Sequence, residues 1–235
     1  MGKKIRVGVL FGGKSAEHEV SLQSARNIID AIDKDKYEVV PIGIDKSGQW
    51  FLNEAEKLLP EANTEGLIAQ DEDARVTLMP EGRGEIVGHS VPGGMGAVDV
   101  VFPVLHGPMG EDGTVQGLLR IADVPYVGPN VLGSAVGMDK DVTKRLLRDA
   151  GIPNAAWRTV NRFEAADVDL DGVVAELGLP LFVKPANMGS SVGVSKAHDL
   201  GELGPALEEA FRYDNKVLIE AFVEAREIEI SVLGN

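Results

Sequence analysis

Two lysines lie in settings where a polyphosphate could bind them. Lys184 ends the apolar run LPLFVKPA, and Lys140 lies in the segment GMDKD. A lysine this far along an apolar strand needs a counter-charge, and nucleotide phosphates are a natural one. Lys140 taken alone fits a solvated helix position equally well. Lys184 is therefore the stronger of the two candidates for a phosphate contact.

A turn rich in glycine and serine, NMGSSVGVSK (residues 187–196), follows Lys184. The backbone N–H groups of such a turn and the hydroxyls of Ser190 and Ser191 can fold over phosphates and exclude water. An ordinary flexible hairpin has the same composition. The nearby Lys184 favours the phosphate-binding interpretation.

Carboxylates in KVLIEAFVEAREIEI could recognise the rest of a nucleotide. Glu220 follows a strand core and Glu227 follows a short turn, so they could accept hydrogen bonds from an adenine amino group or ribose hydroxyls. The backbone of Ala221, Phe222 and Val223 would run along the base. Glutamates that only protect an edge strand from aggregation are common, so composition alone leaves both interpretations open.

The segment HGPMGEDGTVQG (residues 106–117) is dense in glycine, follows a buried strand and leads into a helix. Backbone N–H groups at such a place can bind a carboxylate or phosphate, with the His106 side chain as an additional donor. A strand-end histidine bonded to nearby backbone is the simpler alternative for His106 alone.

The stretch GVLFGGKS (residues 8–15) matches the P-loop pattern, but its setting argues against that function. Val9, Leu10 and Phe11 continue an apolar strand, which leaves too few residues for a phosphate nest. We expect no helix directly after Ser15, and acidic residues follow it. The stretch therefore predicts a strand-to-helix connection, in which Glu17 could hold an ammonium group.

Strands and helices alternate along the first half of the chain, which predicts an α/β domain with a largely parallel sheet. The expected elements are strands at 5–11, 37–44 and 98–106, a helix at 21–32 capped by Ser21, a helix opened by Thr114, and short strands around ARVTLMP and VPYVG.

A second set of elements begins near Asn130, so we expect domains at 1–132 and 133–235. Its elements are one or two helices closed at Gly151, the strands AAWRTV, LPLFVKPA, VGVSKA, KVLIEAFV and EIEISVLG, a helix ending at Gly178 and a helix through ELGPALEEAFRY. Consecutive strands with two helices predict a mixed or antiparallel sheet with helices on one face.

Composition excludes several classes of protein. The formal charge of −14 and pI of about 4.7 argue against a nucleic-acid or anionic-membrane surface. Without cysteine there is no disulfide or thiol nucleophile, which fits a cytoplasmic protein. No apolar run approaches the ~18 residues of a membrane span.

Taken together and in order, these segments resemble the D-alanine:D-alanine ligases of the ATP-grasp superfamily. The residues that carry the resemblance are FGGKSAEHEVSLQSA, HGPMGEDGTVQGLLRIADVPYVG, GSAVGMDKDVTKRLLRDAG, LPLFVKPANMGSSVGVSK and KVLIEAFVEAREIE. The resemblance implies a Rossmann-like, parallel-sheet pre-ATP-grasp domain followed by the α+β first subdomain of an ATP-grasp fold.

The resemblance also implies a reaction. ATP phosphorylates one D-alanine, and a second D-alanine attacks the acyl phosphate to give the dipeptide for peptidoglycan. Glu17 would hold the first ammonium, and His106 would lie by the substrate carboxylates. The nucleotide contacts would be Lys140, Lys184, Ser190, Ser191, Glu220, Ala221, Val223 and Glu227, with Ser190 also close to the reacting groups.

The family continues past Asn235 with a mobile loop, an arginine over the intermediate and the magnesium ligands. We therefore expect Mg²⁺ as a cofactor but no metal ligand in this chain, and no ligation by these residues alone. A non-catalytic protein that binds ATP or an amino acid is the main alternative, and a D-alanine:D-lactate or D-alanine:D-serine ligase is another. A homodimer is left open. A Rossmann dehydrogenase is a distant third alternative, because this sequence has no G-x-G-x-x-G pattern after a strand.

Overall fold

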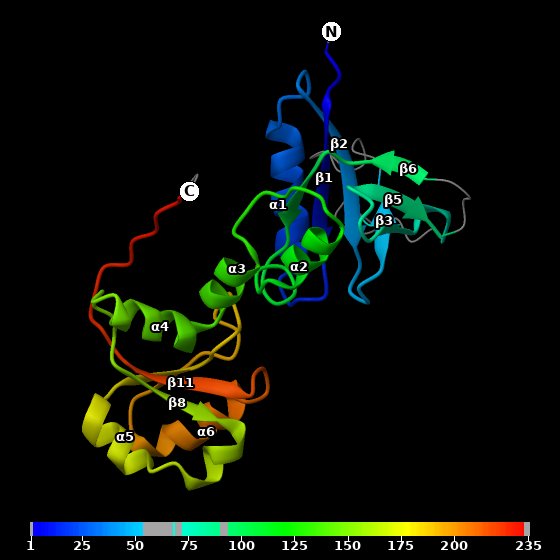
Figure 1. The fold of residues 1–235 in the computed structure, drawn as a ribbon. Helices are drawn as coiled ribbons and strands as arrows, with labels where there is room; N and C mark the ends of the chain where they lie inside the picture. The colour runs from blue at the N-terminus through cyan, green and yellow to red at the C-terminus, as the bar shows by residue number, and fades with distance from the viewer. Residues whose placement is uncertain (1, 54–67, 69–71, 90–93, 233–235) are drawn as a thin grey trace. The chain divides into compact units, whose positions relative to one another are not determined.

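The computed structural model describes residues 2–53, 68, 72–89 and 94–232 (Figure 1). The chain forms two compact units, residues 1–139 and residues 140–235. The boundary expected from the sequence, after residue 132, stays a prediction.

A four-stranded sheet forms the centre of the first unit, with the strand order β3-β2-β1-β7. β1 (Ile5–Gly12) pairs in parallel with β2 (Tyr37–Ile44) and with β7 (Val100–Val104), while β3 (Trp50–Leu52) is antiparallel to β2. The largely parallel sheet predicted from the sequence is confirmed. Because β1 runs through Gly8 without interruption, residues 8–11 form a strand and not a phosphate nest.

The alternating side chains of β1 supply a core on each face of this sheet. Val9 and Phe11 pack with helix α1 (His18–Ala31), and Leu10 packs on the opposite face with residues of α2 (Thr114–Ile121). All three strand residues are fully buried, and burying each side chain stabilises the fold by roughly 1.5–3 kcal/mol. This packing on both faces holds β1 in place between α1 and α2.

Helix α1 begins at His18, so the prediction that Ser21 caps it was wrong. Ser21 is fully buried inside the helix; its hydroxyl donates to the carbonyl of Val104 and accepts from the N–H of Gly12 at 2.8 Å. Serine is favoured at caps because its side chain can bond to free backbone groups, and here the free groups belong to two strands. Ser21 therefore ties together the carboxyl ends of β1 and β7.

A smaller antiparallel sheet of β4 (Val76–Leu78), β5 (Glu85–Gly88) and β6 (Gly94–Ala97) completes the first unit, with helix α3 (Val131–Met138) at its end and a 3₁₀ turn, η2 (Glu72–Ala74), before β4. The short strand expected at ARVTLMP is present as β4. The expected strand VPYVG is reduced to a single bridge between Tyr126 and Val101. Much of the segment 45–96 lies outside the described residues.

The second unit contains an antiparallel sheet in the order β10-β9-β11-β8, as one of the two sequence-based alternatives predicted. Its strands are β8 (Trp157–Asn161), β9 (Leu181–Pro185), β10 (Ser195–Ala197) and β11 (Lys216–Ala221). Its helices are α4 (Lys140–Asp149), α5 (Leu170–Leu177) and α6 (Leu200–Ala210), with a 3₁₀ turn η3 (Arg162–Asp167) after β8. Within this unit, α5 and α6 lie together on one face of the sheet and α4 lies on the other (Figure 1).

The alternation of side chains along β9 and β11 explains this division. Leu181, Val183, Val217 and Ile219 are fully buried against α5 and α6. The residues between them point to the opposite face, because successive side chains of a strand alternate. The helix-free part of that face is where a binding site can form.

The strand expected at EIEISVLG was wrong for its described residues, 227–232, which have no regular structure. Ile228 is 71% exposed and Ile230 is 87% exposed. An alternating pattern becomes a strand only when a neighbouring strand satisfies its backbone, and none of the described strands pairs with this segment. Among the described residues, no helix has the length and apolar character needed to cross a membrane.

Candidate functional site

A cavity of about 460 Å³ lies on the face of the second-unit sheet that carries α4, and Lys140, the first residue of α4, is part of its lining. Every residue for which the family resemblance implied a nucleotide contact is part of the lining of this cavity. The lining consists of Lys140, Phe182, Lys184, Met188, Gly189, Ser190, Ser191, Val194, Glu220, Ala221, Val223 and Glu227. The structure thus brings together side chains that come from α4, from two neighbouring strands and from the turn after β9.

Both lysines reach this cavity, from different elements. Lys140, the first residue of α4, donates from Nζ to the carbonyl of Met188 at 2.5 Å and from its backbone N–H to the carbonyl of Ala186 at 3.0 Å. Lys184 Nζ lies 3.2 Å from Glu220 Oε1. The counter-charge that the sequence argument required for Lys184 is therefore present within the protein, as Glu220.

The glycine and serine turn is built for backbone contacts. Ser190 and Ser191 have φ values of 45° and 57°, and Gly193 has 68°. L-residues rarely adopt this conformation, and successive turns of this kind can direct N–H groups toward an anion. The turn is fixed at its start because Asp214 accepts from both the backbone N–H (2.8 Å) and the side-chain amide (2.9 Å) of Asn187.

Aromatic side chains beside the cavity were missed in the sequence analysis. Phe182 lines it, and the ring of Phe182 lies 6.2 Å from that of Phe222. Lys196 Nζ lies 4.2 Å from the centre of the Phe222 ring. The sequence could have indicated Phe182, because it lies two residues before Lys184 on one strand, and side chains two apart share a face of the sheet. Planar apolar surface beside Glu220 suits a purine base.

Helix α4 is held on the sheet by the buried carboxylate of Asp141. Asp141 accepts from Thr159 Oγ1 at 2.6 Å, Trp157 Nε1 at 3.0 Å and Arg145 Nε at 3.0 Å. Burial acts to raise the pKa of Asp141, but the hydrogen bonds from Thr159, Trp157 and Arg145 outweigh it and hold the pKa below its usual value. This anchor fixes the end of the helix that carries Lys140.

The first unit brings the Glu17 and His106 segments together, as the pairing of β1 with β7 requires. Ser15 Oγ donates to the carbonyl of His106 at 2.7 Å, and the His106 ring Nε2 lies 3.0 Å from Ser24 Oγ. The imidazole of His106 is therefore in hydrogen-bond contact with a side chain of α1. The Glu17 carboxylate lies directly against Gly107.

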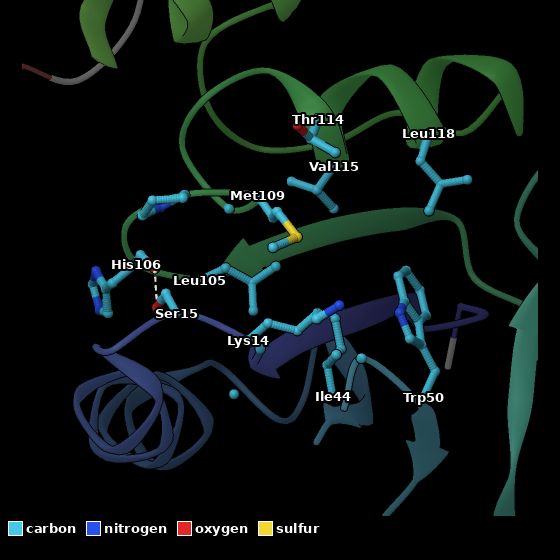
Figure 2. A pocket seen from close by; sticks show the side chains of 15 residues that line it. Lys14, Ser15, Ile44, Trp50, Leu105, His106, Met109, Thr114, Val115 and Leu118 are labelled. Atoms are coloured by element: carbon cyan, nitrogen blue, oxygen red, sulfur yellow. Dashed lines mark hydrogen bonds between the residues drawn. The ribbon is translucent and has the colours of Figure 1, made fainter. Parts of the chain in front are cut away.

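A pocket of about 180 Å³ opens beside these residues (Figure 2). Ser15 and His106 lie at one end of it and Trp50 and Leu118 at the other, with Lys14 between them. Glu17 is near the pocket but is not among its lining residues. The sequence analysis did not identify Lys14 or Trp50 as site residues. Lys14 was assigned to a strand-to-helix connection, and Trp50 lies where the sequence has little periodicity.

The described residues include no group of three or more histidine, cysteine, aspartate or glutamate side chains that could hold a metal ion. The groups around the second-unit cavity, by contrast, suit a nucleotide: ammonium groups can donate to phosphates, carboxylates can accept from the nucleoside, and an aromatic ring can stack on the base.

Two family models match this chain. The model of the D-ala D-ala ligase N-terminus matches residues 6–129, and that of the D-ala D-ala ligase C-terminus matches residues 146–235. The chain is 55% identical to the D-alanine--D-alanine ligase of Shouchella clausii and 51% identical to D-alanine--D-alanine ligase A of Escherichia coli K12. These alignments cover 100% and 99% of the chain, but 64% and 65% of the relatives' lengths.

Solved structures give the same answer for the fold. The VanG D-Ala:D-Ser ligase from Enterococcus faecalis superimposes with a TM-score of 0.82 at 36% identity, covering 94% of this chain and 64% of that protein. The D-alanine-D-alanine ligase from Coxiella burnetii also gives 0.82 at 36% identity, covering 95% and 65%. The parallel and antiparallel sheets described above are thus those of an ATP-grasp ligase. The chain belongs to the D-alanine–D-alanine ligase family.

Proposed function

We propose that this chain provides the ATP site and the first amino-acid site of an enzyme that ligates two D-alanines for peptidoglycan synthesis. The observation that carries the proposal is the gathering of Lys140, Lys184 and the Ser190–Ser191 turn around one cavity that also contains Glu220. These groups come from separate elements of the sequence, so their convergence is difficult to explain by structural needs alone.

The proposed chemistry begins with transfer of the γ-phosphoryl group of ATP to the carboxylate of the first D-alanine. Lys140 and Lys184 would offset the charge of the transferring group, and the turn at Ser190 would exclude water from the acyl phosphate. The amine of the second D-alanine then attacks the acyl carbon; phosphate leaves, and the amide of the dipeptide forms.

In the first unit, the Glu17 carboxylate would hold the ammonium of the first D-alanine, and His106 would lie by a substrate carboxylate. The contacts of Ser15 and Ser24 described above orient this histidine segment. Mg²⁺ would supply further charge to the phosphates; we assign it no ligand among the described residues. Cytoplasmic ATP and precursor pools would place the enzyme in the cytoplasm.

The test is an ADP-release and dipeptide assay on the protein expressed from its complete reading frame, with MgATP and either D-alanine or L-alanine. We expect ADP and D-alanyl-D-alanine in equal amounts with D-alanine only. Lys184→Met should abolish the activity, whereas Lys36→Met, which replaces a lysine that is 72% exposed and paired with Asp33, should leave it unchanged. ATP binding without any amino-acid-dependent ADP release would instead support the non-catalytic alternative.

The similarity to the VanG D-Ala:D-Ser ligase supports a second candidate function, a D-alanine:D-serine ligase. One assay can test this activity and that of a D-alanine:D-lactate ligase. Offering D-serine or D-lactate together with D-alanine, and identifying the products by mass, separates these activities. The greater identity to proteins named D-alanine--D-alanine ligase supports the homodipeptide as the main product.

A further inference from the structure

Lys144, on the second turn of α4, has no role in the site proposed above, yet its side chain is only 11% exposed. Its Nζ donates to the carbonyl of Ala155 at 3.0 Å and lies 3.3 Å from Glu220 Oε2. It also lies over the Trp157 ring, 5.1 Å from its centre. A lysine this enclosed is unusual and requires such compensation.

Glu220 is consequently held between two ammonium groups, one on each carboxylate oxygen. Lys184 is bonded to Oε1 and Lys144 to Oε2, while the glutamate side chain is 18% exposed. The two lysines approach from different sides because Glu220 lies on β11, directly opposite Phe182 of β9 and Trp157 of β8.

The two ion pairs differ in how readily they can break. Lys184 lines the cavity, so a bound polyphosphate would compete with Glu220 for its ammonium. Lys144 does not line the cavity and is fixed by Ala155 and Trp157. If Lys184 turned toward phosphate with no second partner present, Glu220 would be left as a largely enclosed unpaired charge, which is strongly unfavourable.

We propose that Lys144 is a positioning residue: it holds the Glu220 carboxylate oriented toward the base of the nucleotide when Lys184 is drawn to the phosphates. This inference rests on the proposed ATP site, and it assigns Lys144 to recognition of the nucleoside and not of the phosphates. Its removal should therefore weaken ligands with and without phosphates by a similar factor.

Calorimetric titration of the protein expressed from its complete reading frame with MgATP, ADP and adenosine tests this directly. Loss of one hydrogen bond to a charged group corresponds to roughly a tenfold weakening, so Lys144→Met should lower all three affinities about tenfold. Lys184→Met should weaken MgATP far more than adenosine. Lys144→Arg, which retains the charge, should recover part of the loss.

Arg148→Met provides the matched control, because Arg148 also lies over Trp157, at 5.4 Å, but has no contact with Glu220. This variant should bind all three ligands like the wild type. In a Glu220→Gln background, Lys144→Met should cause little further loss, since the group it positions is already neutral.

Each result decides between the hypotheses. Wild-type binding by Lys144→Met, or a loss that grows with the number of phosphates as for Lys184→Met, refutes the positioning role while leaving the ATP site intact. A wild-type protein, expressed from its complete reading frame, that binds none of the three ligands refutes the proposed function itself. If Lys144→Met does not fold, Lys144→Gln, which keeps an N–H donor but lacks the charge, carries the same comparison.

Discussion

Replacing Gly107 with alanine should damage the proposed D-alanine site through a single methyl group. Gly107 has φ of +72°, and a Cβ at this position would overlap the carboxylate of Glu17. The left-handed conformation costs a non-glycine residue roughly 1–2 kcal/mol. The overlap is with a side chain, so Glu17 would move away before the backbone does.

The expected loss of binding follows because the displaced Glu17 carboxylate would no longer reach the ammonium group of D-alanine. A hydrogen bond to a charged group contributes about 1.5–3 kcal/mol, which corresponds to roughly a 10- to 100-fold weaker affinity for the amino acid. We expect Gly107→Ala to show that loss for D-alanine in an NMR titration, together with a fall of roughly 1–2 kcal/mol in the free energy of unfolding.

Gly117→Ala is the control, because Gly117 lies within α2 and a Cβ there meets no atom within 4 Å. Alanine in a helix is favoured over glycine by about 1 kcal/mol, so this variant should be slightly more stable and bind D-alanine normally. An undiminished D-alanine affinity in folded Gly107→Ala would refute the assignment of the ammonium to Glu17.

The second unit supports three further predictions. Because the pKa of Asp141 is lowered, its ionised form stabilises the fold above the unfolded pKa of about 3.9, and that stability is lost as pH falls through the lower folded pKa. Asp141→Asn should remove this acid dependence of the melting temperature. The substitution should also lower the free energy of unfolding by about 1–3 kcal/mol at pH 7. Asp214→Ala should release Asn187, speed amide exchange in the turn and weaken MgATP several-fold with little change in adenosine affinity. Gly193→Ala should destabilise the turn by at least about 1 kcal/mol in denaturant unfolding, since its φ is +68° and a Cβ would lie 2.9 Å from Pro185.

Local sequence patterns were sufficient to predict features of the fold that depend only on neighbouring residues. The apolar run of β1, and therefore the rejection of a P-loop at Gly8, needed only the period of the side chains. The same holds for the end of α5 at Gly178, whose positive φ suits glycine. The grouping of Lys140 with Lys184 came from the family resemblance, because nothing local connects residues so far apart.

Features that depend on distant partners could not be predicted in this way. Ser21 has the residue type of a helix cap, but its hydroxyl is used between two strands that only the folded sheet brings together. The segment after Glu227 has the alternation of a strand but pairs with none of the described strands. Trp50 enters the first-unit pocket only because β3 joins the edge of β2.

The position of Glu220 also changes how the charge of the second-unit cavity should be understood. The sequence argument treated an enclosed lysine as evidence of a missing anion, but in the structure Lys184 is already paired with Glu220. In the proposed function, a nucleotide therefore competes with a carboxylate for this ammonium, and its binding energy is the difference between two ion pairs. That difference favours the nucleotide only if the displaced carboxylate keeps another partner, which Lys144 supplies. The proposed ATP site would therefore depend on three lysines, of which Lys140 and Lys184 line the cavity.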